Sequence, residues 1–316
     1  MNDKSLSVGI VGAGSMGKNH VRVISLLKEF DLKIICDPNK DVLNEYSESL
    51  GIKTTSNIMD LKDCCEAVII ASPTIHHLEA IISLAPYIKN FFVEKPMVAS
   101  LTEAITLKDT IKKHDLNLQV GFIERFNPTI TVLSELIDSV GKIINLDFTR
   151  SNKVDRILDV DVVTDLMIHD IDLALFLNGP VKNISANGSI IKNSAEFCIA
   201  TFEHENGSHS RLLASKVTNK KIRSLHLTTS ECYVDCDLLK KEIYMHKSSN
   251  LIDSSDNFYR VESTSETIEV GYQEALLSEL ISFGKYCYNN KTRVPSFDDG
   301  LNALKIVEII QSQLYK

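Results

Sequence analysis

The chain has 316 residues, of which 44% are hydrophobic and 24% charged, a globular composition that excludes a largely disordered protein. Its formal net charge of −8 argues against a protein whose main task is to wrap nucleic acid, which would carry a basic excess. No uncharged apolar run approaches the roughly 20 residues of a membrane-spanning helix, and the N-terminal segment lacks a secretory signal pattern. The seven cysteines have no repeating spacing, so we expect reduced thiols and a cytoplasmic location. The length of the chain suggests about two domains.

Strands and helices alternate through the first 122 residues, which predicts a parallel sheet covered by helices on both faces. The predicted strands lie at 6–11, 32–36, 67–71, 91–94 and 117–122. The predicted helices, recognised by the helical spacing of apolar residues, lie at 15–30, 41–50, 77–88 and 101–114. Such sheets bind ligands beyond the carboxyl ends of their strands, so the segments that follow the strands are the candidate site.

The second half of the chain predicts a different kind of domain. After a helix, a strand and a long apolar helix, strand-like segments are separated by turn signals such as Asn206-Gly207, which is typical of an antiparallel sheet. The predicted helices lie at 128–139, 165–177, 271–290 and 298–314, and the first strand at 144–150. We therefore expect an α/β fold. Its doubly wound parallel-sheet domain spans residues 1–124, and an α+β domain with a largely antiparallel open sheet spans 125–316, with the last helix packing back on the first domain.

A glycine-rich turn follows the first predicted strand directly and opens the first helix, with the sequence Gly12-Ala13-Gly14-Ser15-Met16-Gly17. Gly12 permits a tight turn, Gly14 leaves room for a pyrophosphate, and Gly17 lets the helix approach the strand. The positive end of the helix then faces the phosphates, which makes Ser15 and Met16 candidate cofactor contacts as well.

An acidic residue, Asp37, ends the second predicted strand twenty residues after Gly17. Its carboxylate can accept hydrogen bonds from the ribose hydroxyls of a dinucleotide and would repel a 2′-phosphate, so the pattern favours NAD over NADP. The alternative is purely structural: the glycines only shape a turn, and Asp37-Pro38-Asn39 only starts a helix.

The loop after the third predicted strand contains small residues and a proline, over which a cofactor can lie flat. Ser72, Pro73, Thr74 and His77 are its candidate cofactor contacts. For the neighbouring His76 we favour a structural position at the start of the next helix.

The next two strand ends carry charged residues. Glu94 and Lys95 precede a proline, which forbids continuation of the strand and holds Lys95 beside the expected nicotinamide position. Glu94 and Lys95 are candidate cofactor contacts, and Lys95 is also a candidate base or hydroxyl-binding group. The alternative is a surface salt bridge of Glu94 and Lys95. Arg125 suits a substrate phosphate or carboxylate, or an interdomain salt bridge. Asn127 reads first as a helix N-cap.

Three polar residues of the apolar helix at 165–177, Asp165, His169 and Asp172, fall within an arc of roughly 60° in an α-helix. A carboxylate four residues from an imidazole suits a histidine that accepts a proton from an alcohol. A divalent metal site is a second interpretation, and a hydrogen-bonded core histidine is a third. Spacing alone does not decide among the three.

Taken together, these motifs resemble the glucose–fructose oxidoreductase/inositol dehydrogenase (Gfo/Idh/MocA) family. The resemblance also includes Met-Gly-x-x-His at Met16 to His20 and the segment Pro295 to Gly300. It implies a Rossmann domain that carries NAD(P), a substrate domain built on an open sheet, and hydride transfer without a metal. By resemblance, Lys95 and His169 take part in proton transfer, and Asp165 supports the histidine or holds a sugar hydroxyl. Family members commonly form homodimers or homotetramers through the open sheet.

Within the family, the string from Gly121 to Pro128 is similar to that of UDP-N-acetylglucosamine 3-dehydrogenases, although that group often has histidine where this chain has Phe122. Such enzymes form a ketone that a pyridoxal-phosphate aminotransferase converts to an amino sugar, which makes an aminotransferase an expected pathway partner. We expect an enzyme that oxidises carbon 3 of a UDP-N-acetylhexosamine, with Lys95, Arg125, Asn127, Asp165 and His169 as substrate contacts, and no membrane or nucleic-acid partner. The alternatives are an inositol, polyol or sugar-acid dehydrogenase and an NAD-binding regulator without catalysis.

Overall fold

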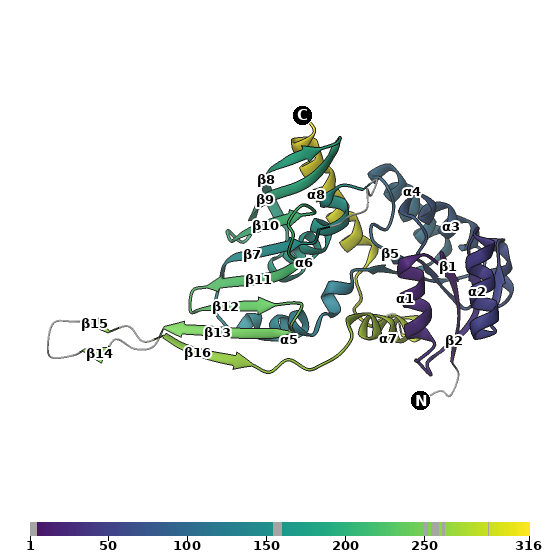
Figure 1. The fold of residues 1–316 in the computed structure, drawn as a ribbon, viewed down its shortest axis with the longest axis horizontal. Coiled ribbons are helices and arrows are strands. Elements are labelled where there is room, and N and C mark those ends of the chain that lie inside the picture. The colour runs from purple at the N-terminus through teal and green to yellow at the C-terminus, as the bar shows by residue number, and fades with distance from the viewer. Residues whose placement is uncertain (1–4, 154–159, 249–251, 254–258, 261–262, 290) are drawn as a thin grey trace. The chain divides into compact units, whose positions relative to one another are not determined.

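The computed structural model describes residues 5–153, 160–248, 252–253, 259–260, 263–289 and 291–316 (Figure 1). Its contacts divide the chain into two compact units, Met1–Ile123 with Ala275–Leu304, and Glu124–Glu274 with Lys305–Lys316. The sequence-based boundary between residues 124 and 125 lies one residue later. The return of Ala275–Tyr288 to the first unit was not predicted, because a chain that crosses back to an earlier domain leaves no local signal.

The first unit contains a six-stranded parallel sheet in the order β3-β2-β1-β4-β5-β6. Its strands are β1 (Leu6–Val11), β2 (Phe30–Cys36), β3 (Lys53–Thr55), β4 (Ala67–Ile70), β5 (Asn90–Glu94) and β6 (Asn117–Gly121). Strands β2 and β3 are added on one side of β1, and β4, β5 and β6 on the other, so the strand order reverses between β1 and β4. This is the Rossmann arrangement, and the predicted fold class is confirmed. The short edge strand β3 was missed because its three residues contain no apolar run.

Helices cover this sheet, and a later segment of the chain completes its core. The helical elements are α1 (Ser15–Ile24), α2 (Lys40–Leu50), η1 (Ile58–Asp63), η2 (Thr74–His76), α3 (His77–Leu84), α4 (Leu101–His114), η3 (Ile123–Phe126), of which only Ile123 belongs to this unit, and α7 (Ala275–Tyr288). Helix α7 contributes Leu280 and Phe283 to a core cluster with Ile10 and Phe92 of the sheet. The Phe92 and Phe283 rings meet edge to face with centroids 5.7 Å apart, a favoured aromatic geometry.

The second unit contains an eight-stranded sheet in the order β16-β13-β12-β11-β7-β10-β9-β8, in which only β7 and β10 pair in parallel. Its strands are β7 (Ile143–Ser151), β8 (Val181–Ile191), β9 (Ser194–His204), β10 (His209–Ser215), β11 (Ile222–Thr229), β12 (Cys232–Asp237), β13 (Glu242–Ser248) and β16 (Ser263–Ile268). A separate pair is formed by β14 (Ile252–Asp253) and β15 (Tyr259–Arg260). The largely antiparallel sheet is therefore confirmed.

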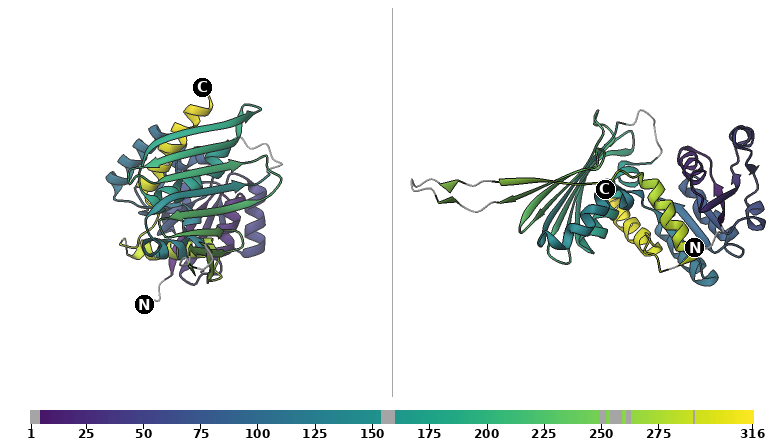
Figure 2. Two further views of the ribbon diagram at one scale, coloured as in Figure 1. Left: turned by 90° about the vertical axis from the view of Figure 1, so that its left-hand side faces the viewer. Right: turned by 90° about the horizontal axis from the view of Figure 1, so that it is seen from below.

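Helices pack on one face of this sheet, as Figure 2 shows for the teal helices and the end of α8. The helical elements are α5 (Pro128–Leu136), η4 (Ile137–Ser139), a π-helix η5 (Val163–Met167), α6 (Ile168–Asn178) and part of α8 (Phe297–Leu314). Buried and more exposed residues alternate along the strands, as expected for an antiparallel sheet with one covered face. The π-turn widens the helix at Asp165, so the predicted uniform α-helix over 165–177 is wrong at its start.

The last helix, α8, belongs to both units, with the division at Leu304 and Lys305. In the second unit, the Gln313 side chain accepts a hydrogen bond from the Ala186 N–H at 2.7 Å and donates one to the Ile184 carbonyl at 3.2 Å. Only the first part of the helix groups with the first unit; the sequence analysis placed the helix in the second domain and expected it to pack back on the first. All seven cysteines are free thiols, and no described helix has the length and apolar character needed to cross a membrane.

Candidate functional site

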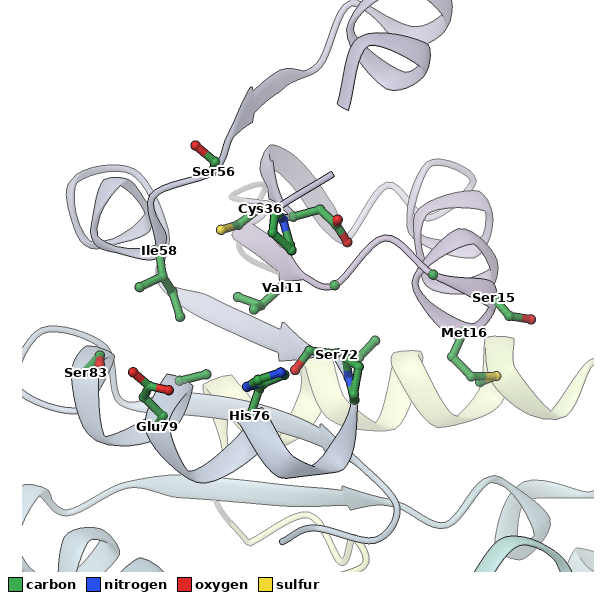
Figure 3. A pocket seen from close by; sticks show the side chains of 17 residues that line it. Val11, Ser15, Met16, Cys36, Ser56, Ile58, Ser72, His76, Glu79 and Ser83 are labelled. Atoms are coloured by element: carbon green, nitrogen blue, oxygen red, sulfur yellow. The ribbon is translucent and has the colours of Figure 1, made fainter. Parts of the chain in front are cut away.

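A cavity of about 920 Å³ opens in the first unit at the carboxyl ends of β1, β2 and β4 (Figure 3). Three segments predicted from the sequence contribute to its wall: the glycine turn, the end of β2 and the loop after β4. The lining residues from these segments are Val11, Gly12, Gly14, Ser15, Met16, Cys36, Asp37, Pro38, Ala71, Ser72 and Pro73. The position agrees with the rule that open α/β sheets bind ligands where the strand order reverses.

The three glycines of the turn have distinct surroundings. Gly12 has φ +92°, and a Cβ there would lie 2.4 Å from the Ser72 backbone nitrogen. A Cβ on Gly17 would lie 2.0 Å from the Gly12 carbonyl oxygen, closer than any real contact. Gly14 has no heavy atom within 4 Å of its Cβ position, which leaves open space on that side. A side chain therefore does not fit at Gly12 or Gly17, the two ends of the turn, whereas Gly14 in the middle faces open space.

Asp37 ties the end of β2 to this turn. One carboxylate oxygen accepts the Ala13 N–H at 2.7 Å and the other accepts the Asn39 N–H at 2.8 Å. Each carboxylate oxygen has a second lone pair, so these bonds leave capacity for ribose hydroxyls. The neighbouring Cys36 thiol is not a nucleophile at neutral pH, because burial raises its pKa to about 11.

The residues around the turn fit the diphosphate of a dinucleotide. Helix α1 has glycine at its N-cap, no capping side chain and no acidic residue in its first turn, so its positive end is not neutralised locally. Within the described part of the chain, the buried Ser72 Oγ has no hydrogen-bond partner. A polar side chain in a cavity wall that lacks a protein partner is suited to bind a ligand.

The two adjacent histidines after β4 differ in exposure, and His76 lies at the N-cap of α3, the structural position that the sequence analysis favoured. His76 is exposed and lines the cavity, whereas His77 is buried, with Nε2 2.8 Å from the Ser72 carbonyl and Nδ1 3.1 Å from the Pro96 carbonyl. Burial lowers the pKa of His77, so its neutral ring donates to one of these carbonyls at a time. Helical spacing was the available signal, because His77 shares the buried face of α3 with Ile81 and Leu84.

Other cavity residues were not identified from the sequence. They are Ser56, Ile58, Glu79, Ala80 and Ser83. His76, Glu79, Ala80 and Ser83 recur at helical spacing, so once His76 is placed at the cavity the same face of α3 follows. Of the predicted cofactor contacts, Gly17, Thr74, His77, Glu94 and Lys95 are not among the described lining residues, and their contacts with a cofactor stay predictions.

In the second unit, each aspartate between residues 165 and 172 pairs with a different cation. Asp165 lies 3.2 Å from the Lys216 Nζ. Asp170 accepts hydrogen bonds of 2.7–3.0 Å from Arg150, and Asp172 accepts two from Arg125 at 2.6 and 2.8 Å. The partner of Asp165 was not predicted, because Lys216 lies directly after β10, far from Asp165 in the chain. For the metal interpretation, no group of three or more histidine, cysteine or acidic side chains suited to a metal ion occurs among the described residues.

Arg125 and Asn127 are both bound within their own unit. The Arg125 guanidinium is 8% exposed, pairs with Asp172 and stacks over the Phe176 ring at 4.8 Å. Asn127 caps α5 by accepting the Thr129 N–H at 3.1 Å, and its amide donates to Glu124 at 3.2 Å. The N-cap interpretation is confirmed, and a substrate contact of either residue stays a prediction.

A buried ionic cluster, which the sequence analysis did not identify, joins η3, β7 and α6. The fully buried Arg150 donates to Asp170 and, at 2.7 Å, to Glu124, which also lies 3.3 Å from Arg223. Burial opposes a charge on Arg150, but the two carboxylates raise its pKa above the ordinary value, so it stays charged. Burial alone would raise the pKa of Glu124, but Arg150 and Arg223 bring it below its usual range.

Comparison with known proteins agrees with this architecture. The model of an oxidoreductase family with an NAD-binding Rossmann fold matches residues 6–122, and the GFO/IDH/MocA C-terminal domain matches residues 145–234. UDP-N-acetylglucosamine 3-dehydrogenase of Acidithiobacillus ferrooxidans is 24% identical over 305 residues, covering 96% of this chain and 94% of that protein. Glucose-6-phosphate 3-dehydrogenase of Bacillus subtilis is 24% identical over 344 residues with the same coverage. Myo-inositol 2-dehydrogenase of Thermotoga maritima is 28% identical over 198 residues, 59% of each chain.

A solved structure of the Acidithiobacillus ferrooxidans enzyme superposes with a TM-score of 0.88 at 22% identity and covers 98% of both chains. At that identity the superposition shows a shared fold, including both the parallel and the antiparallel sheet.

Proposed function

Since the chain belongs to the GFO/IDH/MocA family of NAD-binding oxidoreductases and is a dehydrogenase of CH–OH groups, we propose that it oxidises carbon 3 of a UDP-N-acetylhexosamine such as UDP-N-acetylglucosamine. The supporting observation is the pair of relatives that align over 96% of this chain. Both are named 3-dehydrogenases, and both are named for sugars that carry phosphate. The inositol dehydrogenase aligns over only 59% of the chain.

We propose NAD rather than NADP as the cofactor, held by Gly12, Gly14, Ser15, Met16, Asp37, Ser72 and Pro73. The Asp37 carboxylate supports this choice because it borders the cavity and is held in place by two backbone N–H groups. A 2′-phosphate beside it would be repelled by the negative charge of the Asp37 carboxylate. When bound, NAD supplies a hydride acceptor.

The proposed proton-transfer residues are Lys95 and His169, and the base that takes the hydroxyl proton is one of these two. Asp165 supports the reaction by orienting His169 or by holding a sugar hydroxyl. The Lys216 Nζ, 3.2 Å away, holds one oxygen of this carboxylate, and the remaining lone pairs can accept hydrogen bonds from hydroxyl groups, which favours the second role. Arg125 and Asn127 complete the proposed substrate contacts. In Arg125, the pairing with Asp172 reduces the positive charge available to a diphosphate.

We also propose a cellular location, an oligomeric state and a pathway partner. Seven free thiols suit a reducing cytoplasm. A homodimer or homotetramer and an aminotransferase that consumes the ketone are the proposed partners.

The test is to mix the protein with NAD, UDP-N-acetylglucosamine and a carbonyl trap, and to follow the absorbance of reduced nicotinamide. The trap removes the ketone, because oxidation of a secondary alcohol by NAD is uphill near neutral pH. We expect a rise in absorbance that is absent with free N-acetylglucosamine. A flat trace from a protein that binds NAD in calorimetry would refute this substrate.

The same assay separates the other candidate functions. Turnover of inositols, polyols or sugar acids without any affinity for UDP would identify a dehydrogenase of unactivated substrates, which the inositol dehydrogenase relative favours. Binding of NAD without turnover on the whole panel would identify a regulatory protein.

A further inference from the structure

Two buried histidines of the first unit contact the residues on either side of Lys95. His20, on α1, is 0% exposed and places Nε2 2.7 Å from the Glu94 Oε1. His77, 1% exposed, places Nδ1 3.1 Å from the Pro96 carbonyl oxygen. Neither histidine is among the described residues that line the cavity.

The carboxylate of Glu94 connects His20 with the backbone of Lys95. Its second oxygen, Oε2, accepts the Lys95 N–H at 3.3 Å. The carboxylate has room because Gly121 is its neighbour on β6: a Cβ on Gly121 would lie 3.0 Å from Oε2. A buried carboxylate needs hydrogen-bond donors, and His20 supplies the shorter of these two contacts.

The surroundings of His20 select one form of its ring. In the described part of the chain Nδ1 has no hydrogen-bond partner, whereas Nε2 faces the carboxylate. A ring that carries a proton on Nε2 donates it to Glu94. The Phe92 ring meets His20 edge to face at 5.2 Å and fixes its plane.

We propose that His20 is a positioning residue for Lys95, acting through Glu94. His20 lies on the helix whose first turn borders the cavity, so the His20–Glu94 hydrogen bond links the cofactor-binding helix to the Lys95 peptide. On the other side of Lys95, His77 contacts the Pro96 carbonyl, so both neighbours of Lys95 are held by a buried histidine. This inference rests on the proposed function in one respect, because it assumes that the Lys95 side chain serves proton transfer.

The kinetic test compares two substitutions of His20. His20→Leu removes the donor, whereas His20→Gln keeps an N–H near the position of Nε2. We expect His20→Leu to lower kcat at least tenfold with the KM and the Kd for NAD within threefold of native, because a displaced reacting group costs rate rather than affinity. His20→Gln should restore kcat to within threefold. A native kcat in His20→Leu, alongside an inactive Lys95→Met, would overturn the inference.

A second measurement does not depend on any substrate. The full-length protein is treated with limiting acetic anhydride, and acetylation of Lys95 is measured by mass spectrometry relative to the exposed Lys113. We expect the ratio to change at least threefold in His20→Leu and also in Gly121→Ala, which displaces Glu94 independently of His20, and to stay native in His20→Gln. Unchanged ratios in both altered variants would overturn the positioning role. Full activity of Lys95→Met would instead contradict the proposed function, whatever the acetylation ratios.

Discussion

Substitution of Arg150 by methionine should destabilise the second unit strongly. Arg150 is 1% exposed, and its guanidinium makes three contacts of 2.7–3.0 Å with Asp170 and one of 2.7 Å with Glu124. Removing one partner of a buried ion pair typically costs about 3–5 kcal/mol, because the remaining charge is neither solvated nor paired. Here Glu124 retains Arg223 at 3.3 Å, so the uncompensated charge is that of Asp170.

The same reasoning predicts a partial rescue. Arg150→Met combined with Asp170→Asn removes both charges and leaves Glu124 opposite Arg223. The double variant should therefore recover about half of the lost free energy of unfolding.

The pH dependence gives an independent check. Burial already raises the pKa of Asp170 above its ordinary value, and loss of Arg150 removes the charge that opposes this rise. In the folded variant Asp170 therefore keeps a proton that the unfolded chain releases near pH 4. Between that pH and the raised pKa of Asp170, the free energy of unfolding of the variant falls as the pH rises. The deficit of Arg150→Met relative to native should accordingly be smaller at pH 5 than at pH 8.

The assay is urea unfolding of the full chain followed by circular dichroism at pH 5 and pH 8, with Arg223→Met as the matched control because Arg223 is partly exposed. The reasoning fails if Arg150→Met stays within about 1 kcal/mol of native, or if the double variant is no more stable than the single one.

Three further predictions concern the cofactor turn and a buried histidine. Gly17→Ala should weaken NAD binding in calorimetry at least tenfold, because its Cβ would lie 2.0 Å from the Gly12 carbonyl oxygen; Gly271→Ala, with no heavy atom within 4 Å, is the control and should bind normally. Asp37→Asn keeps an acceptor for the Ala13 N–H but loses its charge, so the ratio of NADP to NAD affinity should rise roughly tenfold or more, and an unchanged ratio would contradict the role of Asp37. Burial lowers the pKa of His204, so the unfolded chain takes up a proton near pH 6.5 that the folded chain excludes. The free energy of unfolding should therefore fall as the pH drops from 7 to 5. The variant His204→Asn, which can keep the hydrogen bond to the Gly179 carbonyl, should show a weaker pH dependence. An unchanged pH dependence in this variant would show that His204 is not its cause.

The parts of the fold that were predictable rest on local patterns. Alternation of apolar strands with amphipathic helices predicted the parallel sheet, and turn signals between short strands predicted the antiparallel one. The G-x-G-x-x-G turn was equally readable, because the positive φ of Gly12 and the close approach at Gly17 leave only glycine without strain. Errors arose where a local signal was short or absent, as for the three-residue β3 and for the π-turn that precedes α6.

The sequence by itself therefore determined the two kinds of sheet, the dinucleotide turn and the acidic residue that follows it, since each depends on residues close together in the chain. Only the tertiary structure decided which charges pair. His20 meets Glu94 across 74 residues of chain and Arg125 meets Asp172 across 47, and no periodicity encodes such contacts.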